Sequence, residues 1–138
     1  MAGDERGSVA VEMVVLVPAL LLIVALLVAG ARIWEARGQV TEAAHRAARA
    51  ATVRSDASAS ARVAEDTAVA NLTEVGCRRQ QVDVDAAALH RDPGFGGKVS
   101  VTVSCTVALT DLLLPGLAGE MTIGASAADP VDRYRGRR

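Results

Sequence analysis

The sequence predicts an α+β fold with a long N-terminal transmembrane helix that continues into a stalk, a second helix, and a small three-stranded antiparallel sheet. Three observations lead to this class. Residues 13–31 carry no charged side chain. Residues 39–51 and 61–75 show the helical period of about 3.6, and three later segments alternate apolar and polar residues as strands do.

The composition describes a small chain with few aromatic residues. Its 138 residues allow at most one modest domain beside a membrane helix. Hydrophobic residues make up 51% of the chain and aromatic residues 2%, so any core is built mainly from Ala, Val and Leu. The 15 basic and 16 acidic residues nearly cancel, so the chain has no overall positive field of the kind that gathers nucleic acid along a basic face, and binding of nucleic acid is not supported.

The uncharged run at residues 13–31 predicts the transmembrane helix. At about 1.5 Å per residue such a helix spans about 28 Å, close to the thickness of one hydrocarbon core. Pro18 lies in its first half, where we expect a slight kink rather than an end to the helix. The chain can therefore cross a membrane once.

A cleaved secretory signal peptide is the alternative for this segment. Ala29-Gly30-Ala31 has the small-x-small pattern of a signal-peptidase site, and cleavage after Ala31 would release a soluble secreted domain. Two features favour the permanent helix. The apolar run is longer than the apolar core of a usual signal peptide. In addition, Asp4 and Glu5 place negative charges in the N-terminal region, which is positively charged in a signal peptide.

Glu12 is an acidic residue near the start of the apolar segment. A carboxylate inside a membrane helix costs about 2.5–3.5 kcal/mol on insertion scales, so it needs a partner or a place near the interface. One interpretation puts Glu12 at the headgroup boundary. The other starts from Gly7, because cleavage after Gly7 would give Ser8 a free amine four positions from Glu12 on one helix face. The same pair could form between neighbouring subunits.

The segment Gly7 to Glu12, GSVAVE, followed by a long apolar helix, resembles the processing site of type IV prepilins and pseudopilins. Within that group, residues 6–129 are similar to TadE-like proteins of the tight-adherence pilus system. The resemblance implies a pilin-like fold, cleavage between Gly7 and Ser8 by a prepilin peptidase, and registration of subunits by Glu12. It also implies a short cytoplasmic N-terminus with the C-terminal domain outside the membrane.

Residues 39–51 continue the helix beyond the membrane. Small apolar residues form one stripe along it: Val40, Ala43, Ala44, Ala47, Ala48 and Ala51. Two interpretations remain open, since the stripe either lets another helix approach closely or lies on the chain's own domain. His45 falls off the stripe, and we expect it at the surface without a metal ion.

A second helix is expected after a break at residues 54–58, where cap-forming residues gather. Its candidate N-caps are Ser55, Asp56 and Ser58. Its apolar stripe consists of Ala61, Ala64, Ala68, Leu72 and Val75, and Gly76 is expected to end it.

Alternating patterns predict strands at residues 82–86, 99–110 and 121–127. The Asp-Pro-Gly and Gly-Gly sequences within residues 90–97 predict a turn between the first two, and hence an antiparallel pair. The connection at residues 112–120 is unusually apolar. It either caps the thin core or forms an exposed contact patch.

Cys77 and Cys105 are the only cysteines. A disulfide between them would join the end of the second helix to the long strand, and the loop-entropy model assigns such a closure about 3–4 kcal/mol. Two buried free thiols are the alternative, because Cys on an apolar face is also an ordinary core residue. A disulfide would require an oxidising compartment, which agrees with a domain outside the cytoplasm.

The sequence carries no recognisable catalytic motif. Neither His45 nor His90 has a nucleophile or acid in a known pattern, so we expect no enzyme, no cofactor, no metal site and no small-molecule substrate. The expected boundaries are a leader at 1–7, the transmembrane helix at 8–31, the stalk and second helix at 32–75, the sheet domain at 76–129 and a basic tail at 130–138.

The hypothesis that joins these features is a minor pseudopilin that takes part in the structure or assembly of a tight-adherence pilus. Its expected partners are other pilus or pseudopilin subunits, a prepilin peptidase and the bacterial cell membrane, which it crosses once with its C-terminal domain outside. The alternative is a membrane-anchored extracytoplasmic binding module that does not polymerise. Charge alone leaves the orientation open, since Arg6 and the amino terminus nearly balance Arg32 and Arg37.

Overall fold

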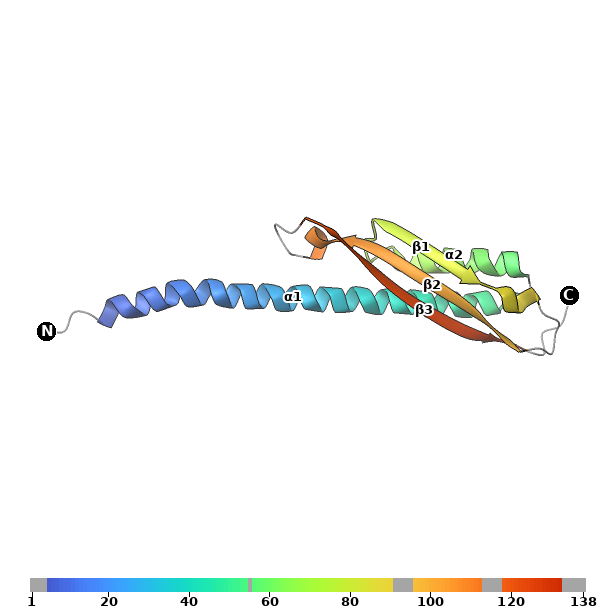
Figure 1. The fold of residues 1–138 in the computed structure, drawn as a ribbon, viewed down its shortest axis with the longest axis horizontal. Helices are drawn as coiled ribbons and strands as arrows, with labels where there is room; N and C mark the ends of the chain where they lie inside the picture. Colours follow the sequence, from blue (N-terminus) through green and yellow to red (C-terminus); the bar gives the residue numbers. More distant parts are fainter. Residues whose placement is uncertain (1–4, 55, 91–95, 113–117, 133–138) are drawn as a thin grey trace.

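The computed structural model describes residues 5–54, 56–90, 96–112 and 118–132, with side chains from Met13 onward except at residues 111 and 112. Helix α1 protrudes from one side of a compact head, and its C-terminal half forms part of that head (Figure 1). We call residues 36–132 the head. The elements are α1 (Glu5–Thr52), α2 (Ala57–Leu72), β1 (Arg79–Asp85), β2 (Gly97–Ala108) and β3 (Glu120–Val131), with the 3₁₀ helices η1 (Ala87–His90) and η2 (Leu109–Leu112). The predicted α+β class is confirmed.

Helix α1 is one continuous helix through both its apolar and its alanine-rich parts. Pro18 lies inside it without ending it, since neighbouring turns keep their hydrogen bonds when a single proline removes one amide. The helix ends at Thr52, whose hydroxyl donates to the Arg49 carbonyl at 2.8 Å. The apolar segment therefore continues into one longer helix, as expected, and the second half of that helix is part of the head.

One of the three predicted N-cap residues caps the N-terminus of helix α2. Asp56 is the N-cap, and its carboxylate accepts from the Ala59 amide at 2.8 Å and from the Ser58 hydroxyl at 2.6 Å. Ser55, another candidate, lies outside the described residues. The helix ends at Leu72, earlier than expected, and a turn leads to Gly76, whose φ of 73° is a conformation that favours glycine.

The three strands form an antiparallel sheet in the order β1-β2-β3. Val103 pairs with Val82 on one side and with Ala125 on the other, so the apolar faces of all three strands coincide. Strand β2 ends at Ala108, and the expectation that the strand reaches residue 110 was wrong because the chain turns into η2 at Leu109. Residues 91–95 of the expected turn, 113–117 of the apolar connection and 133–138 of the tail lie outside the described residues.

Both helices cover the same face of the sheet, and one core joins them (Figure 1). The core is built from small and branched residues: Val40, Ala43, Ala44, Ala47, Ala48 and Ala51 of α1, Ala64, Ala68 and Leu72 of α2, and Val99, Val101, Val103, Cys105, Ile123 and Ala127 of the sheet. Buried Ser60 donates its hydroxyl to the Ala51 carbonyl at 2.9 Å, which satisfies the polar group where the two helices meet.

Candidate functional site

The N-terminal segment that carries the predicted processing site is helical in its backbone. Helix α1 begins at Glu5, so Gly7, Ser8 and Glu12 all lie within its first turns. Their side chains lie outside the described part of the chain. Cleavage after Gly7 and the role of Glu12 in subunit registration therefore stay predictions.

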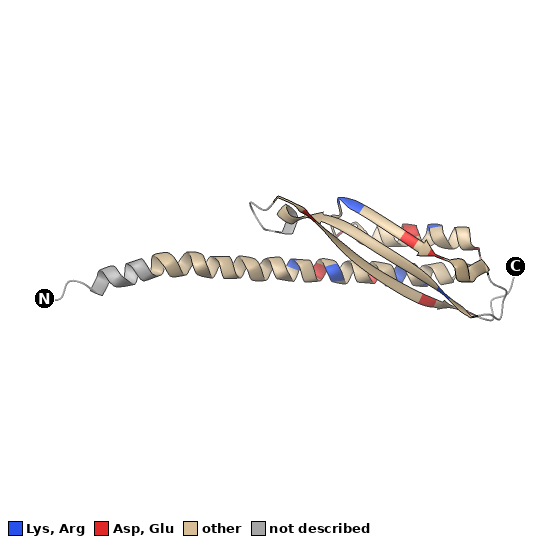
Figure 2. Ribbon diagram, viewed as in Figure 1, with Lys and Arg blue, Asp and Glu red and all other residues tan. Residues whose placement is uncertain are grey.

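The protruding part of α1 exposes an unbroken set of large apolar side chains. Leu22 is 72% exposed and Leu26 is 70% exposed, and no charged residue occurs from Met13 to Ala31 (Figure 2). The most apolar window of this helix has a mean hydropathy of 3.0, and 6% of that window is buried. Within the described residues, α1 is the one helix long and apolar enough to cross a membrane. The exposed apolar surface of α1 favours contact with lipid or with a partner, because removing each such side chain from water contributes about 1.5–3 kcal/mol of free energy.

The alanine stripe on the second half of α1 is fully covered. Val40, Ala43, Ala44 and Ala47 are all 0% exposed, and they pack against α2 and the sheet of the same chain. The interpretation in which this stripe receives a neighbour's helix was wrong. The small side chains instead let the chain's own α2 and sheet approach α1 closely.

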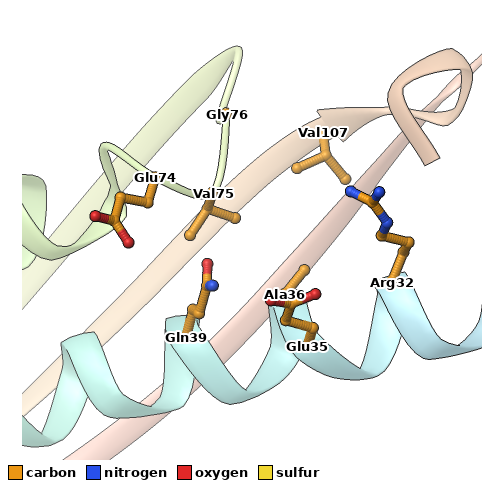
Figure 3. Close-up of a pocket in the computed structure, with 8 residues that line it drawn as sticks. All are labelled: Arg32, Glu35, Ala36, Gln39, Glu74, Val75, Gly76 and Val107. Atoms are coloured by element: carbon orange, nitrogen blue, oxygen red, sulfur yellow. The ribbon is translucent and has the colours of Figure 1, made fainter.

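The head and the protruding helix meet at a groove of about 250 Å³ (Figure 3). Arg32, Glu35 and Gln39 line it from α1, while Glu74 and Val75 line it from the turn after α2. Figure 3 shows Gln39 extending from α1 toward this turn and the Glu74 carboxylate extending from the turn toward α1. The groove therefore gathers charged groups of both signs where the uncharged part of the helix ends.

A second groove of about 280 Å³ lies further along α1 and includes Glu42, His45, Arg46 and Asp129. Arg46 forms an ion pair with Glu42 at 2.7 Å. The hydrogen bond from Arg46 is the main reason why the pKa of Glu42 lies below its ordinary value. His45 is exposed, as expected. Within the part of the chain that the structure describes, no group of three His, Cys, Asp or Glu residues could hold a metal ion.

A disulfide joins Cys77 to Cys105, as predicted. Cys77 lies just after the turn at Gly76, and Cys105 points from β2 into the core, where it is 0% exposed. The bond thus fixes the turn that carries Glu74 and Val75 to the central strand. One wall of the first groove depends on this link.

Residues 7–49 match the model of the TadE-like protein family. The predicted resemblance to the TadE-like family is confirmed over this segment, which holds Gly7, Ser8, Glu12 and most of α1. The TadE-like match ends before α2 and the sheet, whereas the resemblance was expected to reach residue 129. No curated protein matches the chain, and no solved structure does.

The groove at Arg32 and Glu74 was not predicted from the sequence. Arg32, Trp34 and Glu35 follow directly after the apolar run, which was a signal that this turn lies at a membrane boundary. Glu74 gave no such signal, because 42 positions separate it from Arg32 and only the packing of α2 on α1 brings the two elements together. The TadE-like match includes the residues that line the groove from α1, but it does not include Glu74.

Proposed function

We propose that the protein is a structural or assembly component of a tight-adherence pilus of the type IV kind, a minor pseudopilin anchored in the membrane by α1. The observation that carries this proposal is the place of the TadE-like match. Residues 7–49 include the exposed apolar part of α1, where Leu22 and Leu26 are 72% and 70% exposed. A helix of this kind can exchange lipid for a neighbouring subunit's helix within the bilayer.

The proposed assembly step uses the first turns of α1. A prepilin peptidase cleaves after Gly7, and the new amine of Ser8 carries a positive charge. Glu12 of one subunit then pairs with the amine of its neighbour, which sets the register between helices. In an apolar surrounding an unpaired carboxylate is costly, so the pairing favours one alignment over others.

The proposed topology places the head outside the bacterial cytoplasmic membrane, with a single crossing by residues 13–31. The Cys77–Cys105 disulfide supports this side, because such bonds persist in oxidising compartments. The exposed outer surface of the head is then available to other subunits, in the membrane or in a surface pilus. We propose no catalytic role for the head.

The test is the N-terminus of the mature protein, taken from its native membrane and determined by intact mass. Ser8 as the first residue is the expected result. An uncleaved chain would favour the membrane-anchored binding module that does not polymerise, and Arg32 as the first residue would mean that residues 1–31 were a signal peptide.

A variant separates the assembly role of Glu12 from anchoring. Glu12→Gln keeps the shape of the side chain and removes its charge, so we expect membrane insertion to persist and co-assembly with other pilus subunits to fall. Glu65→Gln is the matched control, since it makes the same change on an exposed residue of α2 that lies outside both grooves. Normal assembly of Glu12→Gln would contradict the registration mechanism.

A further inference from the structure

One side of α1, turned away from the core, carries the only tryptophan of the chain between two glycines. Gly30, Trp34 and Gly38 recur every four positions, so they lie along one side of the helix. Val40 follows Gly38 by two positions, or about 200° around the helix, and is 0% exposed in the core. We call Gly30, Trp34, Gly38 and Thr41 the outer strip of α1.

The two glycines of the outer strip have no explanation in the packing of their own chain. Both lie inside a 48-residue helix, where glycine is less favourable than alanine. A Cβ added at Gly30 or at Gly38 would meet nothing within 4 Å. Lipid and water adapt to the shape of a helix, so neither requires a glycine. A second helix is rigid, and small residues let its backbone approach closely, so the glycines favour a helix as the neighbour of this strip.

Trp34 provides a large side chain that such a neighbour would cover. It is 79% exposed. Side chains on a helix lean toward its N-terminus, so the indole reaches toward the level of Gly30, one turn earlier. A second α1 that lies alongside in the same direction has its own Gly30 at that level. Each indole can then pack on the glycine of the other helix, and burial of so large a ring favours the contact.

Charged residues of opposite sign flank the outer strip. Arg37 lies on one side of it, and Glu42 lies on the other side, five positions further along the chain. In a parallel pair of helices, residues with this spacing meet across the contact, as the g and e positions of a coiled coil do. Arg37 has no ion pair among the described side chains, and the pair between Arg46 and Glu42 uses only the Oε1 atom of the carboxylate, at 2.7 Å.

The outer strip is complementary to itself. It carries an indole together with the glycine that can receive it, and a cation together with the anion that can pair with it. A contact between two copies related by a two-fold axis requires this property, because every contact between two different residues then occurs twice. The strip therefore fits a second copy of the same chain.

We propose that two copies of the protein pair through parallel α1 helices along the outer strip, with Trp34 of each copy on Gly30 of the other and Arg37 of each beside Glu42 of the other. The inference rests on the membrane anchoring in the proposed function, because anchors in one membrane give both helices the same direction. It adds a second copy as the partner, and a register between helices that does not depend on Glu12.

Cysteine cross-linking of the full chain in phosphatidylcholine bilayers tests the pairing. Thr41→Cys places a thiol on the outer strip, and Glu35→Cys places one on an exposed part of α1 about 120° away, as the control. The two native cysteines are bonded to each other, so each variant has one free thiol. Under mild oxidation we expect Thr41→Cys to form a covalent dimer and Glu35→Cys to stay monomeric. Any other pattern would overturn the proposal.

A size variant in the Thr41→Cys protein assigns the dimer to the outer strip. Gly30→Leu fills the space that receives the indole, and we expect loss of the dimer. Ala25→Leu is the matched control, because it adds bulk to the exposed apolar helix about 180° from Trp34 and should keep the dimer. Equal effects of the two variants would contradict the assignment.

A charge variant in the same protein tests the flanks. Arg37→Glu places an acid beside Glu42 of the other copy and should weaken the cross-link. Arg62→Glu makes the same change of charge on an exposed residue of α2 and should leave the cross-link unchanged. An equal loss in both variants would indicate an effect of net charge alone and would overturn the pairing of Arg37 with Glu42.

Fluorescence of the single tryptophan distinguishes pairing from contact with lipid, since tryptophan also favours the membrane interface by itself. In a pair, Trp34 is shielded from acrylamide, and both dilution of the protein with lipid and the Gly30→Leu change should increase quenching. Shielding that responds to neither would mean that lipid alone covers Trp34, and it would overturn the proposal.

Alkaline extraction of the same membranes separates this inference from the proposed function. A chain that stays in the membrane and forms the expected dimer supports both. A chain that stays in the membrane without the dimer overturns the pairing and leaves the proposed function intact. A chain that is released overturns both, because the parallel pair requires the anchor.

Discussion

The two halves of α1 are both helical and each carries an apolar surface, yet these surfaces differ in the size of their side chains. From Met13 to Val28 the helix carries mainly Leu, Val and Ile, and these large side chains are exposed. From Val40 to Ala51 the apolar stripe is mainly alanine, and it is fully buried. Large side chains on a helix that nothing covers suit lipid or another subunit, whereas small side chains let the chain's own elements approach.

The comparison teaches that side-chain size distinguishes two uses of an apolar helix surface. The boundary between them lies near Arg32 to Ala36, where charged residues first appear after the apolar run and the core stripe of the helix begins. The stability of the head should therefore respond to changes in the second half of α1 and in the elements packed on it. It should not respond to changes in the first half.

The largest expected effect on the head comes from its disulfide. Replacing both cysteines, Cys77→Ala/Cys105→Ala, should lower the free energy of unfolding by about 3–4 kcal/mol, because the bond closes a loop with a sequence separation of 28. Chemical unfolding of the full chain, followed by circular dichroism, measures the loss. Reduction of the unmodified protein is the control and should give a similar loss, while recovery in the membrane fraction should not change. Unaltered stability would contradict the role of the bond.

The second prediction exchanges side-chain size between the two halves. Ala47→Leu adds bulk at a position that is 0% exposed, and overpacking of this kind should cost about 1–3 kcal/mol of the free energy of unfolding. Leu22→Ala, on the exposed half, should change head stability by less than about 0.5 kcal/mol. Denaturant titration of both variants checks the difference. Equal effects would break the distinction between the halves.

Two glycines give a smaller pair of effects with opposite sign. Gly38 lies in α1 with nothing within 4 Å of an added Cβ, so Gly38→Ala should raise the free energy of unfolding by about 0.5–1 kcal/mol. Gly97 begins β2 directly against Ala88, and the added methyl of Gly97→Ala would collide with that side chain. This variant should be less stable than the unmodified protein. Thermal unfolding of the two variants side by side tests the signs, and a gain from Gly97→Ala would contradict the close packing of η1 on β2.

The smallest effect is expected at the cap of α2. Asp56→Ala removes the acceptor for the Ala59 amide and should lower the Tm by about 4 °C. The hydrogen bond from Ser58, with a smaller contribution from the Ala59 amide, holds the pKa of Asp56 below its ordinary value. An acid with a lowered pKa in the folded state stabilises the protein above its ordinary pKa and loses that contribution as the pH falls through the folded value.

The pH dependence of this cap provides its own check. The Tm difference between the unmodified protein and Asp56→Ala should be constant above about pH 5 and should shrink below about pH 4. Asp66→Asn serves as the control, because Asp66 is an exposed acid within the same helix and does not cap it. A difference that stays constant down to about pH 2 would contradict the role of the ionised carboxylate.

The order and type of the elements could be predicted because each has a local signal. The uncharged run predicted the protruding helix, the alternation around Val101 and Val103 predicted β2, and Asp56 was among the expected caps. The element ends were less accurate. Leu109 continued the apolar alternation yet begins η2, because the strand's end depends on what the chain packs against rather than on its own pattern.

The candidate sites divide in the same way. Gly7, Ser8 and Glu12 were recognised from a contiguous motif, and the family match covers them, while their chemistry stays a prediction. The disulfide was predictable because the chain has only two cysteines. The groove was not predictable, since it exists only where the turn that carries Glu74 packs against α1. The use of the alanine stripe also required the structure, because an alanine stripe suits either an internal or an external partner.

The most direct test of the account compares spin labels on the two sides of the proposed membrane boundary. Leu22→Cys and Val53→Cys each add one free thiol at an exposed position, since the two native cysteines are bonded to each other. After reconstitution in lipid bilayers, power-saturation electron paramagnetic resonance measures the accessibility of each label to oxygen and to a water-soluble nickel complex. If the first half of α1 lies in lipid, a label at position 22 collides with oxygen and is shielded from the nickel complex, while a label at position 53 is accessible to the nickel complex. A label at position 22 that is open to nickel would contradict the claim that this half of α1 lies in lipid.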